Sequence, residues 1–411
     1  MSCRRLRFAT PFLLLAAILA PSITNAAALR WNNPAGGNWN VPGNWLPANL
    51  PTATDTAVVD LPGTYTITVN QNVSIAGLRV NGSASGTQTL TAVSRTLTFS
   101  SPVTLGAQCV ANWTSCSVTG AGAIANEGTF NLASTSIAQA LSNSGTLVVT
   151  GTSTQSGALT TVGGSMLRIS GTAAANGQLT VATGFTNNAT IELTSSGAAT
   201  AATLTLTAGT LVNAPGAQIN ALAGSGGARN LHAQYDNQGT INVSQALSTN
   251  RASTDCTNSG TINVTGGNYT VVLSGTTPSW TTTGTINVAA SRTLTLQGVV
   301  AGGAGMNYFY NGGTFGGAGT IALLNSTLNL TSGIASSMAH LDGTTSIVNG
   351  PSTLTISGGT TVQMTSSTIN APAVVEAGAT LQMASSDFTG AVTNQGLVEY
   401  TGACSQNGAF T

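Results

Sequence analysis

The sequence predicts an all-β protein built as a parallel β-helix solenoid, and three observations support that fold class. Only 5% of the 411 residues are charged, against roughly 25% in an ordinary soluble domain. Hydrophobic residues still make up 41%, which distinguishes the chain from disordered proteins, because those are poor in such residues. Many of them are β-branched and alternate with polar residues, and a short phrase recurs roughly every 20 residues.

The recurring phrase is clearest as NQGTINV at 237–243, NSGTINV at 258–264 and TGTINV from Thr283. Aligned on the residue two before its Gly, the phrase is also found at Asn126, Asn143, Val162, Asn187, Thr207, Thr282 and Gly317, and it resumes at Asn394. The steps between Asn126 and Gly317 vary from 17 to 35 residues. Such a period indicates stacked units that share one core, and we expect the longer segments, 207–237 and 282–317, to form loops.

Each unit reads as a turn followed by a strand. Asn and Gly adopt left-handed backbone conformations at little cost, and the following TINV or TLTL alternates polar with apolar side chains. The apolar set is expected to point inward and to stack from coil to coil. Asn at successive turns either forms a hydrogen-bonded ladder along the rod or only satisfies turn geometry, and the sequence leaves both open.

The N-terminus, 1–28, has the pattern of a signal peptide. Three arginines precede an apolar run, and small residues follow at Ala26 to Ala28. The run is shorter than the roughly 20 apolar residues that span a bilayer. We therefore expect a protein that is secreted or displayed on the cell surface, with no membrane span in the mature chain.

Residues 29–74 are expected to form an N-terminal cap, and 75–411 the β-helix repeats. Trp31, Trp39 and Trp45 lie close together in the first segment among several prolines. Large rings over a chain of small residues favour a cap over the open end of the core. The alternative is that these rings stack on carbohydrate, so all three are also candidate carbohydrate-binding residues.

The cysteines predict one disulfide. Cys109 and Cys116 are near enough in sequence to close a small loop in an oxidising compartment. Cys256 and Cys404 would lie several coils apart in a linear stack, beyond the roughly 7 Å between Cα atoms that a disulfide allows. We expect those two to be buried thiols that fill small core positions.

The front of the chain resembles a known class of proteins. The pattern W-x-N-x-x-G-G-N-W-x-x-x-x-N-W-x-P, followed by LPTATDTAVVD, YTITVN and VSIAGLRVNG, resembles the start of large bacterial secreted β-strand-repeat proteins, covering about 31–82. Those resemble autotransporter passenger adhesins with a right-handed, pectin-lyase-like β-helix. The resemblance implies surface display and adhesion. The chain departs from that pattern at its end, where a C-terminal translocator would be expected, so we anticipate a missing segment or a partner covering the last coil.

Charge and motifs exclude several function classes. Every basic residue is Arg, and once the three in 1–28 are set aside, seven arginines face ten acidic residues. No basic stripe is left to neutralise nucleic-acid phosphates or to bind a membrane surface. Short His or Cys spacings typical of a metal site are also missing, and no cofactor fingerprint occurs, so we expect neither metal nor cofactor.

Some parallel β-helix proteins are polysaccharide lyases or hydrolases, which need clustered carboxylates and a basic residue. The best candidate catalytic group is His232, Asp236, Arg251 and Asp255, since the two carboxylates are about one coil apart. Tyr308 and Tyr310, in NYFYNGGTF, are further candidates for sugar stacking, on an inserted loop that equally could fold back over a coil.

The favoured function is a non-catalytic, structural or adhesive solenoid that binds a cell-surface glycan or protein through its lateral face. The main alternative is a carbohydrate-active β-helix enzyme. A third is an ice-binding protein with a ladder of Thr hydroxyls, which we rank last because the variable steps argue against one Thr register kept over many coils.

Overall fold

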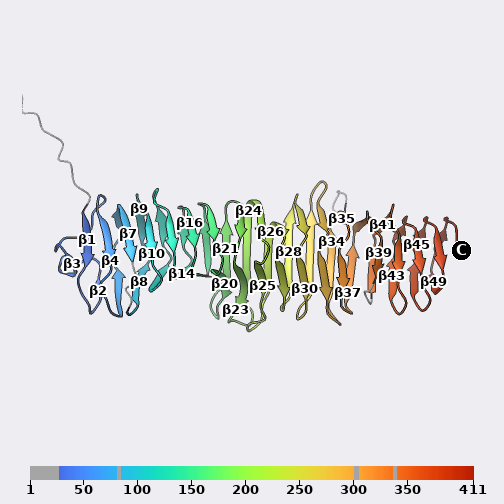
Figure 1. Cartoon of the computed structure of the whole chain (residues 1–411), viewed down its shortest axis with the longest axis horizontal. Helices are drawn as coiled ribbons and strands as arrows, with labels where there is room; N and C mark the ends of the chain where they lie inside the picture. Colours follow the sequence, from blue (N-terminus) through green and yellow to red (C-terminus); the bar gives the residue numbers. More distant parts are fainter. Residues whose placement is uncertain (1–26, 81–84, 300–304, 337–339) are drawn as a thin grey trace, which may run out of the picture.

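The chain forms a straight rod of stacked coils in a computed structural model that describes residues 27–80, 85–299, 305–336 and 340–411. The rod has about 16 turns, and Figure 1 shows them succeeding one another along its long axis. The fold class is confirmed as an all-β parallel β-helix solenoid. In the described residues, the one helix is the three-residue 3-10 segment η1 (Pro42–Asn44). The predicted signal peptide lies outside the described residues, apart from Ala27 and Ala28.

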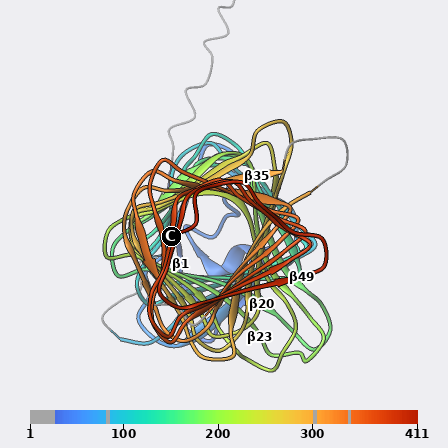
Figure 2. The same ribbon diagram turned by 90° about the vertical axis from the view of Figure 1, so that its right-hand side faces the viewer.

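Each coil contributes strands to three walls. In one regular coil, β10 (Val103–Leu105), β11 (Cys109–Thr114) and β12 (Ser117–Thr119) follow one another around the axis. The chain then returns with β13 (Ile124–Asn126), which pairs in parallel with β10. Neighbouring coils are therefore held together by ladder hydrogen bonds at a spacing of roughly 4.8 Å. Seen end-on in Figure 2, the coils superpose around a common centre.

The walls differ in extent. The first is an eight-stranded sheet from β3 (Trp45–Leu46) to β19 (Leu159–Thr161), and the second has thirteen strands, from β2 (Gly37–Asn38) to β36 (Thr314–Gly316). The third wall runs on to the end of the rod. Beyond β19, the first and third walls belong to one continuous sheet, because β24 (Ala202–Asn213) pairs along its length with strands of both.

The core follows from strict alternation of side chains. In β30 (Thr261–Val264), Ile262 and Val264 are at most 1% exposed, whereas Thr261 and Asn263 face outward. Parallel pairing in register stacks Ile262 between the equivalent isoleucines of the adjacent coils. One coil alone buries little, but the stack buries a continuous aliphatic column, so the predicted shared core is confirmed.

The asparagines of the repeat form a buried ladder. In one stretch, Nδ2 of Asn213 donates to Oδ1 of Asn237 at 2.7 Å, and Nδ2 of Asn237 donates to Oδ1 of Asn258 at 2.7 Å. Thr282 continues the ladder, since its hydroxyl accepts from Nδ2 of Asn258 at 3.1 Å. The spacing of the repeat phrase predicts Thr207 in this column, but the structure places Asn213 there, six residues later on the long strand β24.

The repeat glycine has a different role from the one expected. Gly260 and Gly284 do not have left-handed backbone angles. A Cβ at Gly284 would lie 2.1 Å from the carbonyl oxygen of Gly260 in the preceding coil, and Gly260 has the same relation to Gly239. Adjacent turns therefore approach too closely to admit any side chain, and this close approach is what requires glycine here.

A second buried ladder lies at the corner between two strands that follow one another in a coil, as between β40 (His340–Thr344) and β41 (Ile347–Asn349). The backbone N–H of Ser346 donates to Oγ of Ser367 at 3.0 Å, and that of Ser367 donates to Oγ of Ser386 at 3.0 Å. Each such residue follows a non-glycine residue with φ near 50°. Cys404 continues this ladder in the last coil, where its Sγ accepts from the N–H of Ser386 at 3.5 Å. Cys116 lies at another corner, between β11 and β12, where its N–H donates to Oγ1 of Thr135 at 3.3 Å.

The N-terminal end is closed by the tryptophan cluster, as a cap requires. Strand β3 pairs antiparallel with β1 (Ala28–Trp31), so the first wall ends on a strand that breaks the parallel pattern. Trp45 lies edge-on to Trp31 and Trp39, with ring centroids 5.2 and 4.6 Å apart. Coil strands begin well before residue 75, because β4 (Thr56–Val59) already pairs with β1 and with the next coil.

The two expected insertions are largely strand. The segment 282–317 contains four wall strands, namely β33 (Thr285–Val288), β34 (Thr293–Gly298), β35 (Met306–Tyr310) and β36. In 207–237, the main irregular stretch is 222–228, which joins the second wall to β26 (Arg229–Asn237). The long steps therefore came from misaligned phrases more than from loops.

Candidate functional site

The candidate carbohydrate-binding tryptophans belong to the core. Trp31, Trp39 and Trp45 are each at most 2% exposed, and Nε1 of Trp45 donates to the carbonyl of Trp39 at 2.9 Å. A buried ring offers no face to a sugar. The sugar-stacking alternative for these three residues is therefore wrong in this structure, and their packing serves the cap.

Tyr308 and Tyr310 are also core residues. They lie on the wall strand β35, so neither the exposed platform nor the folded-back loop is found. Tyr308 is 1% exposed and packs against Trp280 with ring centroids 5.1 Å apart, and Tyr310 stacks on Phe315. Burial raises the pKa of both phenols, and their rings are closed to a carbohydrate.

The predicted disulfide is not formed. Cys109 and Cys116 are both free thiols, as are the other cysteines of the described residues, Cys256 and Cys404. Cys109 begins the six-residue strand β11, which alone separates the two by more than about 15 Å of extended chain. That distance exceeds what a disulfide spans. Cys256 is buried, as expected, and Cys404 is partly buried.

The two candidate catalytic carboxylates lie on adjacent strands but are held by different partners. Asp236 faces Thr257 in the neighbouring strand and accepts from its hydroxyl at 2.5 Å, and its second oxygen accepts from Gln238 at 2.6 Å. Asp255 lies two residues further back on that strand and accepts from Ser279 at 2.6 Å. Both carboxylates thus bond to side chains beside them on the outer surface.

The other two candidates, His232 and Arg251, share a shallow surface cleft of about 510 Å³. The cleft crosses four successive rungs of the third wall and is lined by Thr205, Thr207, His232, Asn250, Arg251, Ala252 and Ser274. Asp236 and Asp255 are not part of its lining. The structure therefore divides the predicted catalytic group into a basic pair in the cleft and two acids outside it.

An interruption of the parallel pairing coincides with this cleft. Strand β28 (Leu247–Ala252) pairs with β26 only over its first two residues, while it pairs with β31 (Tyr269–Ser274) along its whole length. On the other side of β26, the register with β24 shifts between Thr205 and Thr210. Such irregularities redirect side chains and are frequent beside functional sites.

Arg251 bridges this gap in the wall. Its guanidinium donates from Nη1 to the carbonyl of Leu206 and from Nη2 to the carbonyl of Thr207 at 2.8 Å, two rungs away. His232 lies on the strand between. Burial and, secondly, the charge of Arg251 lower the pKa of His232 below its usual value near 6.5, so His232 is neutral at physiological pH.

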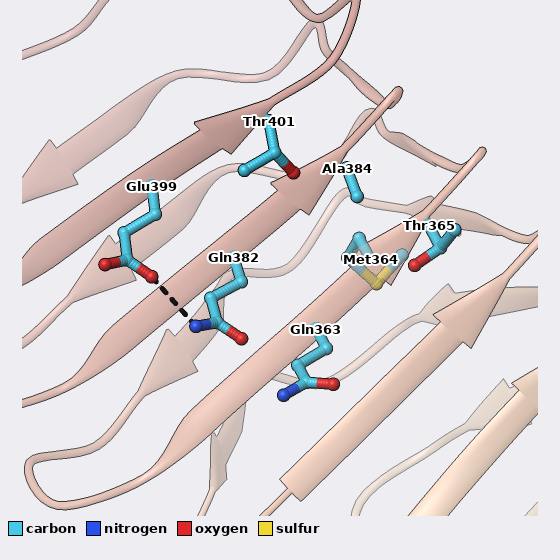
Figure 3. A pocket seen from close by; sticks show the side chains of 7 residues that line it. All are labelled: Gln363, Met364, Thr365, Gln382, Ala384, Glu399 and Thr401. Atoms are coloured by element: carbon cyan, nitrogen blue, oxygen red, sulfur yellow. Dashed lines mark hydrogen bonds between the residues drawn. The ribbon is translucent and has the colours of Figure 1, made fainter.

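A second surface hollow lies near the C-terminal end of the rod (Figure 3). Its volume is about 230 Å³, and Gln363, Gln382 and Glu399 line it from consecutive rungs. Nε2 of Gln382 donates to Oε2 of Glu399 at 2.8 Å. Within this lining Glu399 is the one carboxylate, so the hollow offers hydrogen bonds but not the acid pair that glycoside hydrolysis requires.

The outer face of the second wall presents a regular surface, and we call its middle part the Thr/Asn lattice. One column consists of Thr240, Thr261, Thr285 and Thr314. The parallel column consists of Asn220, Asn242, Asn263 and Asn287. Each Asn of the second column donates to the preceding one at 2.9 Å. Both columns are free of charged residues.

Sequence reasoning missed this lattice although the sequence carried its signal. In TINV the first and third residues alternate with the buried Ile and Val, so Thr and Asn must share the outer face. The ladders expected from the sequence involve Thr and the Asn at the turn, whereas the outer column is formed by the Asn within TINV. The cleft residues Asn250 and Ser274, by contrast, had no local signal at all.

The described residues offer neither a metal cluster nor a membrane-spanning helix. Among those residues, no group of three or more His, Cys, Asp or Glu is arranged to hold a metal ion. Within the same ranges, no helix has the length and apolarity needed to cross a bilayer.

Comparison with known proteins adds no relative. No protein-family model, no curated protein and no solved structure matches this chain. The resemblance to secreted β-strand-repeat proteins is therefore supported at the level of the β-solenoid fold and no further.

Proposed function

We propose that this protein is an exported, non-catalytic β-solenoid of the autotransporter-passenger type, which adheres to a cell-surface or matrix glycan through its lateral face. The observation that carries the proposal is the Thr/Asn lattice. Asn242 and Asn263 each use one N–H and one carbonyl lone pair in the ladder, which leaves the others for a ligand. Individually weak contacts repeated on a rigid rod add up to useful avidity.

The lattice suits adhesion better than turnover. Its groups are uncharged and evenly spaced, so it presents the same hydrogen-bonding surface from coil to coil. An enzyme instead needs titratable groups converging on one bond. The carboxylates Asp236 and Asp255 are outside the cleft that holds His232 and Arg251, which speaks against the lyase or hydrolase alternative.

Binding of the chain lacking 1–28 to glycan and matrix arrays tests this proposal. A polysaccharide lyase and hydrolase assay on the same protein tests the enzyme alternative. The variant Thr261→Lys places a long charged side chain in the middle of the lattice, and Thr104→Lys makes the same change on the first wall. We expect Thr261→Lys to weaken binding by about tenfold and Thr104→Lys to leave it unchanged. Polysaccharide cleavage by the parent protein would establish the enzyme alternative instead.

One observation also favours ice binding as a second candidate. Thr240, Thr261, Thr285 and Thr314 stay in register although the coils differ in length. The objection from variable steps is thereby removed for these coils, because the extra residues are accommodated elsewhere in the turn. Thermal hysteresis in the parent, lost in Thr261→Lys, would favour this candidate over adhesion.

A further inference from the structure

The cleft of Arg251 is built differently from the rest of the rod. Over most of its length each coil repeats the pairing of the one before. At the cleft, β26 runs through the corner as one strand, whereas the next coil divides the same path into β28 and β29 (Asp255–Asn258). The mismatch opens the wall between β26 and β28, and Arg251 extends across the opening.

Arg251 retains most of its hydrogen-bonding capacity. A guanidinium has five N–H donors, and two are used on the carbonyls of Leu206 and Thr207. Three therefore remain, in the planar arrangement that matches a carboxylate or a sulfate. The two backbone bonds hold the group in place, so a ligand would meet an already ordered cation.

The charge of Arg251 has no carboxylate partner. Both ion pairs among the described residues lie elsewhere, at Arg30 with Asp60 and at Arg168 with Glu192. No acidic residue lines the cleft, and Asp255, four positions along the chain, bonds to Ser279. With His232 neutral, the cleft presents one positive charge surrounded by hydroxyl and amide groups.

The rest of the lining suits a sugar that carries an acid group. Thr205 and Thr207 on β24, Asn250 on β28 and Ser274 on β31 supply neutral donors and acceptors around Arg251, on three of the four rungs that the cleft crosses. A small inorganic anion would leave most of these groups in water, whereas an anionic sugar unit can engage them together. The cleft is wide and open to the surface, which allows a polymer to pass through it.

We propose that this cleft binds one anionic sugar unit, through its carboxylate or sulfate group, within a longer surface polysaccharide. The proposal rests on the adhesive function above and adds a chemical class of ligand to it. Arg251 binds the anionic group, and Asn250 and Ser274 bind neighbouring hydroxyls. The lattice on the second wall recognises uncharged repeats, so the two sites differ in their requirement for charge.

Three polymers with one backbone test the proposal: dextran, carboxymethyl-dextran and dextran sulfate. We expect the parent protein to bind at least one charged polymer about tenfold or more tightly than dextran at physiological salt. Arg251→Gln should remove that preference. Arg292→Gln removes the same charge from a partly exposed arginine outside the cleft and should retain it. The comparison of the two charged polymers distinguishes carboxylate from sulfate.

Equal binding of all three polymers by the parent would overturn the anionic site, and so would equal losses in Arg251→Gln and Arg292→Gln. Because Arg251 also holds β24, a second variant, Asn250→Ala, removes a lining group that makes no backbone bridge. A severalfold weaker binding of the charged polymer by Asn250→Ala supports the site even if Arg251→Gln misfolds, and unchanged binding contradicts it. If Thr261→Lys blocks glycan binding but the charge of the polymer has no effect, the adhesive function is supported and this site is not.

Discussion

Arg229 shows how a polar group inside the coils finds hydrogen-bond partners. The residue is fully buried, yet neither of the ion pairs among the described residues involves it. Its guanidinium instead donates to the backbone carbonyls of 222–228, including Leu222 at 2.9 Å and Ala223 at 2.8 Å. Burial lowers its pKa, but an arginine keeps its proton at any physiological pH. One side chain thus supplies hydrogen-bond donors to the carbonyls of an irregular segment that forms no strand pairing.

The cysteines allow a prediction at the same scale. Burial raises the pKa of Cys109 and of Cys256 to about 12, and it also raises that of Cys116. The thiolate is the reactive form, so these three should react slowly at about pH 8. Cys404, which is only partly buried, should be alkylated at least about tenfold faster in the native protein.

Alkylation of the chain lacking 1–28, followed by peptide mass spectrometry, measures the order of labelling. In denaturant without reductant all four cysteines should be modified, because none is bridged in the structure. Protection of Cys109 and Cys116 together under those conditions would reinstate the disulfide expected from their spacing.

At the scale of elements, three side-chain ladders and the strand pairing each link neighbouring coils by hydrogen bonds. The buried Asn column, the corner Ser column and the outer Asn column each run parallel to the rod axis. An amide can donate and accept at once, so it extends a ladder without leaving an unpaired group. A hydroxyl does so too, which explains why Thr282 is accepted within the buried Asn column.

Substitution of Asn237 tests the buried ladder. Asn237→Ala leaves an amide hydrogen of Asn213 and a lone pair of Asn258 unpaired, and we expect a loss of about 2–4 kcal/mol in unfolding free energy. Asn237→Thr should cost less than half as much, because Thr already serves in this column. Urea unfolding of both variants, with hydrogen exchange at Thr261, measures the difference. Equal losses would mean that only the volume of the side chain matters there.

At the scale of the whole molecule, the rod is held together with very little charge. The described residues contain two ion pairs, and one of them, Arg30 with Asp60, is largely exposed. Cohesion must then come from apolar burial and from hydrogen bonds between coils, neither of which salt screens strongly. The polar side chains on the surface are mainly those of Thr, Ser, Asn and Gln.

Thermal stability should accordingly be insensitive to ionic strength. We expect the Tm to change by less than about 3 °C between about 0.05 and about 0.5 M NaCl. The control is Arg168→Gln, which removes the better-shielded ion pair and should lower the Tm only slightly. A strong fall of Tm with salt would show that long-range electrostatics stabilise the stack after all.

Part of the candidate site could be predicted from the sequence. The sequence predicts one group of His232, Asp236, Arg251 and Asp255 from the one-coil spacing of the two carboxylates. His232 and Arg251 do share a cleft, whereas the two carboxylates lie outside it. Spacing along the chain does not say where a strand bends or divides. The break between β26 and β28, which forms the cleft, is such an event.

The sequence by itself determined the solenoid, its inward aliphatic stack and the capped N-terminal end. These depend on the period-2 alternation, the recurrence of about 20 residues and local composition, all of which are written in neighbouring residues. Only the tertiary structure decided which coils align. That alignment made Asn213 a ladder member and carried Arg251 across the strand of His232. Tyr308 points inward, and Cys109 is kept from Cys116, because each lies on an extended wall strand. The physical reason is that register between coils is set by hydrogen bonds among residues some 20 positions apart, and insertions anywhere in a turn shift it without altering the local pattern.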